Sequence, residues 1–111
     1  MDKELQAKIN QLSLMEQSIQ NFALQKQQFQ AQLMEVESAE KELKDSKEVF
    51  KIIGNIMVAS DKEKIKEDLA NKKRILKTRI GSFEKQEAKL KERMNALQQE
   101  VLSEMQKSEK S

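Results

Sequence analysis

The most apolar stretch of this 111-residue chain is VFKIIGNIMVA, residues 49–59, which lies near the middle of the sequence. Two runs of β-branched and aromatic residues flank Gly54 and Asn55, a pattern typical of a β-hairpin with a two-residue turn. Such turns need a positive φ angle, which glycine adopts without steric cost. The stretch therefore predicts a hairpin in which Ile53 pairs with Ile56.

No further segment of this sequence is available to cover the apolar side chains of the hairpin. Side-chain alternation puts apolar residues on both of its faces. A lone two-stranded hairpin is marginally stable in water, and its free edges favour pairing with further strands. We expect hairpins from several chains to pair edge to edge and build a sheet or a β-barrel body, although the hairpin could instead fold onto its own helices. The residues expected to form this assembly surface are Val49, Phe50, Ile52, Ile53, Gly54, Asn55, Ile56, Met57 and Val58.

The segments on both sides of the hairpin carry a seven-residue apolar repeat, which is typical of coiled coils. The motif SDKE, residues 60–63, predicts a capping box at the start of the second helix, with Ser60 as the capping residue. We expect a mainly α single domain with a first arm at 1–46, a hairpin segment at 47–60 and a second arm at 61–111. We call the core positions of the repeats the seam. They are Leu5, Lys8, Leu12, Met15, Ile19, Phe22, Lys26, Phe29, Leu33, Val36, Glu40 and Leu43, and then Leu69, Lys73, Leu76, Ile80, Phe83, Glu87, Leu90, Met94, Leu97, Val101 and Glu104.

Two arms of similar length joined by a tight turn predict a long antiparallel two-helix coiled coil. In such a pair the numbers of opposing residues add up to a constant, and the value 109 aligns Leu12 with Leu97 as well as Ile53 with Ile56. In this register the charged seam residues face apolar ones, a mismatch that lowers stability but can fix the register. The expected pairs are Lys26 with Phe83, Glu87 with Phe22, Lys73 with Val36, and Glu40 with Leu69.

Composition argues against an enzyme, a metal site or a cofactor. The chain has no histidine and no cysteine, so the usual acid–base, nucleophilic and metal-ligand groups are missing. A net charge of +2 gives no strong attraction to nucleic acid or membrane lipid. The basic run KKRILKTR, residues 72–79, could suggest nucleic acid, but it lies within the repeat and lacks aromatic residues, which favours a solvated helix face. With no signal-like or membrane-spanning segment, we expect a cytoplasmic protein.

The segment SKEVFKIIGNIMV, residues 46–58, and the later KRILKTRIGSFEKQEAKLKERMNALQQEV, residues 73–101, resemble the beta-type subunits of the prefoldin family. The resemblance covers nearly the whole chain in order. It implies a hexamer with two alpha-type and four beta-type subunits, whose hairpins form a double β-barrel. It also implies an ATP-independent co-chaperone that captures unfolded polypeptides at its coiled-coil tips and delivers them to a group II chaperonin.

Several apolar residues outside the seam are available for such capture. Ile9, Leu14, Leu102 and Met105 come close to the chain ends, which an antiparallel pair brings together. Flexible, exposed apolar residues suit contact with varied partners. The alternative is a non-catalytic oligomeric coiled-coil scaffold or adaptor, which the sequence does not exclude. The expected client-binding residues are Leu5, Ile9, Leu12, Leu14, Val101, Leu102 and Met105.

Overall fold

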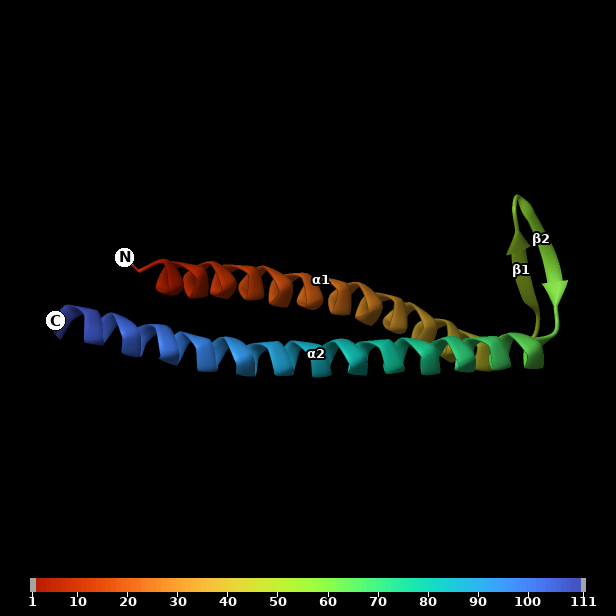
Figure 1. The fold of residues 1–111 in the computed structure, drawn as a ribbon. Coiled ribbons are helices and arrows are strands. Elements are labelled where there is room, and N and C mark those ends of the chain that lie inside the picture. The colour runs from red at the N-terminus through yellow and green to blue at the C-terminus, as the bar shows by residue number, and fades with distance from the viewer. Residues whose placement is uncertain (1, 111) are drawn as a thin grey trace. The chain divides into compact units, whose positions relative to one another are not determined.

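The computed structural model describes the main chain of residues 2–110 and the side chains of residues 2–107. Helix α1 (Lys3–Asp45) is followed by strand β1 (Val49–Ile53), strand β2 (Ile56–Ser60) and helix α2 (Lys62–Lys110), as Figure 1 shows. This confirms the predicted fold class of two long helices joined by a short antiparallel hairpin. The chain divides into two compact units, residues 1–26 with 82–111 (the terminal unit) and residues 27–81 (the hairpin unit).

An aspartate directly precedes each helix. The Asp2 carboxylate accepts a hydrogen bond from the Glu4 N–H at 3.2 Å, and Asp61 accepts one from the Glu63 N–H at 3.1 Å. A side-chain oxygen at this position satisfies one of the amide groups that the first helical turn leaves without a partner. The prediction that Ser60 caps α2 is therefore wrong by one residue, since Ser60 is still part of β2.

Hydrogen bonds connect the two ends of the hairpin at the C-terminus of α1. The Ser46 N–H donates to the Leu43 carbonyl at 3.3 Å, and the Ser46 hydroxyl donates to the Glu42 carbonyl at 3.0 Å. From the first residue of α2, the Lys62 Nζ atom donates to the Ser46 carbonyl at 2.9 Å. A cation near the C-terminus of a helix also interacts favourably with the helix dipole. Lys62 thus links the start of α2 to the end of α1.

The hairpin has the predicted register. Antiparallel pairs run from Val49 with Ser60 at the base to Ile53 with Ile56 beside the turn. Gly54 has a φ angle of 61°, and no other described residue has a positive φ. A two-residue turn that needs a positive φ at its first position only is of type II′. Gly81 lies inside α2, which continues through it without a break.

Burial follows the seam. Every seam position identified from the repeat is buried or half-buried, while most of the remaining described helix surface is exposed. In the terminal unit the rings of Phe22 and Phe83 lie 6.1 Å apart between centroids. In the hairpin unit the guanidinium of Arg79 lies 5.5 Å from the centre of the Phe29 ring. The most buried apolar side chains all belong to the seam and are Leu5, Val36, Leu43, Leu76, Ile80 and Val101.

The charged seam residues form ion pairs with one another, which the layer-by-layer alignment did not predict. In the terminal unit Lys26 Nζ lies 3.5 Å from Glu87 Oε2, and Lys8 contacts Glu104 while its Nζ lies 3.2 Å from Glu100 Oε1. The sequence did not predict these ion pairs because side chains lean along the helix. The ammonium group of a long lysine therefore reaches the carboxylate one layer away and not the residue directly opposite.

The hairpin unit contains the same arrangement. Lys73 Nζ lies 3.4 Å from Glu40 Oε1, so all the charged seam positions of the two helices are paired with opposite charges. The two residue numbers can be added for the Phe22–Phe83 ring contact and for each seam ion pair. The sums range from 105, for Phe22 with Phe83, to 113, for Lys26 with Glu87. These values lie on both sides of 109, which agrees with the predicted register.

Glu87 is the best-connected of these charges. Its Oε1 atom accepts a hydrogen bond from Lys91 Nζ at 3.1 Å, and only 12% of its side chain is exposed. The Lys91 hydrogen bond, together with the charge of Lys26, holds the pKa of Glu87 below its ordinary value of 4.5, against the opposing effect of burial. A lowered pKa means that this group stabilises the fold above pH 4.5, and that the contribution is lost as the pH falls through the lowered pKa.

The register can be tested by crosslinking within one chain. Cysteines introduced as Leu12→Cys and Leu97→Cys, both in the terminal unit, are expected to form an intrachain disulfide under mild oxidation, because a disulfide needs Cα atoms within about 7 Å. The control pair Leu12→Cys with Leu90→Cys is displaced by two helical turns, about 10 Å, and should not crosslink. Non-reducing mass spectrometry separates the two results, and efficient crosslinking of the control would mean a register slipped by one repeat.

The seam ion pairs can be tested by exchanging charges. Lys26→Glu puts a second carboxylate next to Glu87, and is expected to lower the thermal midpoint by about 5 °C, or on the order of 1 kcal/mol in a domain of this size. The double exchange Lys26→Glu with Glu87→Lys restores opposite charges and should recover most of this loss, as a coupling between neighbours requires. Thermal unfolding followed by circular dichroism measures both. Additive losses in the double variant would contradict the pairing.

Candidate functional site

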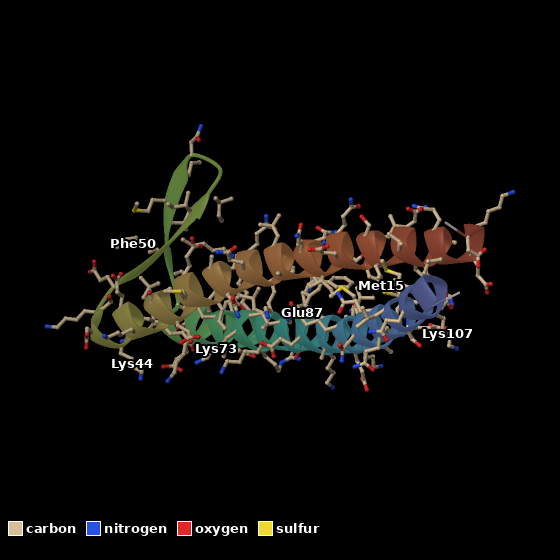
Figure 2. All side chains as sticks on the ribbon, turned by 90° about the vertical axis from the view of Figure 1, so that its left-hand side faces the viewer. Met15, Lys44, Phe50, Lys73, Glu87 and Lys107 are labelled. Atoms are coloured by element: carbon tan, nitrogen blue, oxygen red, sulfur yellow. The ribbon has the colours of Figure 1, made fainter. Side chains whose placement is uncertain are left out.

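The hairpin carries six of the twelve exposed large apolar side chains found among the described residues. Ile52 is 68% exposed on one face, and Ile53 and Ile56 are 60% and 67% exposed on the other. Figure 2 shows side chains projecting from both sides of the strands, with Phe50 on β1. Apart from half-buried Val49, each apolar residue of the predicted assembly surface is exposed. These are Phe50, Ile52, Ile53, Ile56, Met57 and Val58.

The edges of the hairpin are as open as its faces. In the part of the chain that the structure describes, β1 and β2 form a two-stranded sheet with no third strand, so each has one edge without a backbone partner. Lys51 carries the one charge in these ten strand residues. Exposed edges normally bear charges or bulges that block pairing with other strands. This hairpin lacks such protection, and it can accept further strands and bury both faces against them.

The terminal unit also carries exposed apolar side chains. Leu14, Leu102 and Met105 are exposed there, and we call them the terminal set. Leu102 and Met105 are three residues apart on α2, so they share one face of the helix. Ile9, a further residue predicted to bind clients, is half-buried.

The other predicted client-binding residues contribute to the seam. Leu5 and Val101 are 6% and 7% exposed, and Leu12 is half-buried. Because the repeat assigns these positions to the coiled-coil core, packing between the helices leaves little of their side chains accessible to a partner. The described geometry therefore leaves the terminal set as the accessible part of the predicted surface.

Sequence reasoning missed one prominent residue. Met34 on α1 is 71% exposed, the largest value among the exposed large apolar side chains of the described residues. Its position outside the seam was a sufficient signal, because a methionine on the outer face of a heptad helix has no partner within the chain. Leu24 and Ile75, which also lie outside the seam positions, are exposed as well.

The described residues offer no arrangement for metal chemistry and no membrane span. No group of three or more carboxylates in residues 2–107 is placed to hold a metal ion. Neither α1 nor α2, within its described residues, has an apolar stretch long enough to cross a bilayer. The surfaces that stand out are therefore apolar contact surfaces.

Comparison with known proteins gives one consistent family. The family described as "Prefoldin subunit" matches residues 6–109 of the chain. The prefoldin subunit beta of Pyrobaculum aerophilum is 32% identical over 107 residues, which cover 93% of this chain and 84% of that protein. The prefoldin subunit beta of Thermococcus onnurineus is 34% identical over 101 residues, covering 88% and 87%.

A solved structure shares the fold as well. The crystal structure of the prefoldin beta subunit from Thermococcus strain KS-1 superimposes with a TM-score of 0.86 at 31% identity, and the match covers 92% of each chain. The shared part includes both helices and the hairpin between them, which agrees with the resemblance carried by residues 46–58. This chain belongs to the prefoldin subunit family and is of the beta type.

Proposed function

We propose that this chain is a subunit of an ATP-independent holdase, which captures unfolded polypeptides on its coiled coil and delivers them to a group II chaperonin. In this proposal residues 1–111 act as one prefoldin-like domain, located in the cytoplasm. The subunit assembles with an alpha-type prefoldin subunit as a hexamer of two alpha-type and four beta-type chains. The names and the fold of the beta-type relatives support this assignment.

One observation carries the proposal: the helices bury their own apolar residues, whereas the hairpin buries almost none. Ile52, Ile56 and Met57 are each more than three-fifths exposed. Fully burying such a side chain contributes about 1.5–3 kcal/mol, so several hairpins gain much by joining into one barrel. Helical arms would then project from a common body, each with its own terminal set.

Client capture would rest on the terminal set of several arms. A contact with Leu14 or Leu102 buries about 50–100 Å², worth about 1–2.5 kcal/mol, which is too weak to hold a chain alone. Arms tethered to one body raise the effective concentration of further contacts, so several weak contacts can hold one unfolded polypeptide. This also allows release without ATP.

The second candidate is a non-catalytic scaffold or adaptor. It is favoured by the burial of Leu5 and Val101 in the seam, which leaves a small apolar surface at the ends of the helices. A scaffold needs the hairpin assembly but not the terminal set. The two functions therefore differ in what happens when the terminal set is removed.

The hairpin's role in assembly can be tested at the turn. Gly54→Val should abolish the high-order assembly while helix content survives, because valine strongly disfavours the φ angle of 61° at this position. No atom outside the immediate neighbours lies within 4 Å of an added Cβ, so the effect comes from backbone conformation and not from a clash. Native mass spectrometry and circular dichroism provide the readouts. The matched control Asn55→Val places the same side chain at the other turn position, which has no positive φ, and should assemble; an intact Gly54→Val variant would argue against the hairpin as the assembly element.

Client capture can be tested by removing the terminal set. The triple variant Leu14→Ser, Leu102→Ser and Met105→Ser should lose suppression of client aggregation by more than half, with assembly size unchanged, because these side chains lie outside the seam. Light scattering of a chemically denatured client measures this loss. The control variant Leu24→Ser, Met34→Ser and Ile75→Ser removes as many exposed apolar side chains elsewhere and should still protect the client. Full protection by the first variant would support the scaffold function instead.

A further inference from the structure

The hairpin unit contains a groove to which the hairpin itself contributes no residue, and three of its lining residues, Phe29, Val36 and Leu76, belong to the seam. The groove has a volume of about 420 Å³ and runs between α1 and α2. Its floor contains Val36 and Leu76, both nearly buried, and the half-exposed Ile75 rises beside them. Residues from both helices line it: Phe29, Gln32, Glu35, Val36, Lys72, Ile75, Leu76 and Arg79.

The charges on the α2 side of this groove have no anionic partner. Lys72 and Arg79 form no ion pair with any described residue, although each charged seam position does. Arg79 instead lies over the Phe29 ring, 5.5 Å from its centre. Lys72 and Arg79 are seven residues apart on α2, which is two turns or about 10 Å, and Ile75 lies between them. Residues 71–81 contain no aspartate or glutamate that could neutralise them.

The opposite side of the groove has a different charge. Glu35 lines the α1 side and also forms no ion pair among the described residues. The groove is thus basic along α2, acidic at one point along α1 and apolar between them. A complementary partner has an aliphatic stripe with acidic residues on one flank and a basic or neutral residue on the other.

We propose that this groove binds an amphipathic helix from a partner protein, with two carboxylates seven residues apart and an aliphatic side chain between them. The carboxylates pair with Lys72 and Arg79, and the aliphatic side chain covers Ile75 and the exposed edge of Leu76. The bound helix packs against α1 and α2 as a third helix of the coiled coil, which is a common way for helical segments to dock on an apolar groove. An apolar floor favours a protein helix over nucleic acid, whose contacts would be mostly with phosphate. The proposal does not depend on client capture or on chaperonin delivery.

The probe is a synthetic 16-residue helical peptide with two glutamates seven residues apart, a leucine between them and a lysine on the opposite flank. Fluorescence anisotropy of the labelled peptide with the full chain measures its Kd. The double variant Lys72→Glu with Arg79→Glu should weaken binding by about tenfold or more, because both new charges repel the peptide. A second peptide with lysines in place of the two glutamates should bind this variant better than it binds the original chain.

The matched control is Arg74→Glu with Lys77→Glu, which makes the same change in net charge within the same basic run. Neither residue lines the groove, so the control should bind the acidic peptide within about twofold of the original affinity. Equal weakening by both double variants would mean non-specific attraction and overturn the proposal. So would tighter binding of a labelled single-stranded oligonucleotide than of the peptide. A fall in the mass of the peptide-free assembly caused only by the Lys72 and Arg79 changes would identify another copy of the chain as the occupant, and would equally overturn it.

Discussion

The structure depends on the way in which opposite charges meet inside an otherwise apolar seam. A lysine or carboxylate left alone between two helices loses hydration without compensation. Here each such charge has a partner, as with Lys26 and Glu87 or Glu40 and Lys73. A slip by one repeat would place Lys26 near Met94 or Ile80 and leave it unpaired, so the charges discriminate against wrong registers more strongly than the apolar positions can.

The register in turn decides where the hairpin stands. Ile53 pairs with Ile56 across the Gly54–Asn55 turn, and Lys62 donates to the carbonyl of Ser46 at the base of the hairpin. Along the chain, the turn therefore lies midway between the two arms. The helices then satisfy their own apolar residues inside the chain, and the hairpin cannot. This imbalance means that one chain combines a self-sufficient coiled coil with a strand pair whose apolar side chains stay exposed.

Charge has a different role on the surface of α2. The seam uses Lys73, with Glu40 as its partner, whereas the neighbouring Lys72 lines the groove and forms no ion pair with a described residue. Adjacent lysines in one basic run thus differ in their surroundings because neighbouring positions on a helix face different directions. The basic run is better understood residue by residue than as a single patch.

The sequence alone determined the helices, the hairpin register and the seam, because a seven-residue repeat and a Gly-Asn turn are local patterns with few alternative structures. It did not determine how charged seam residues are paired, since lysine reaches along the helix and the layer-by-layer alignment predicted apolar partners for Lys26 and Glu87. It also placed Leu5, Leu12 and Val101 both in the core and in a binding surface, and only tertiary burial separates these roles. The exposure of Met34 and the unpaired state of Lys72 likewise depend on which helix faces meet, which tertiary packing alone decides.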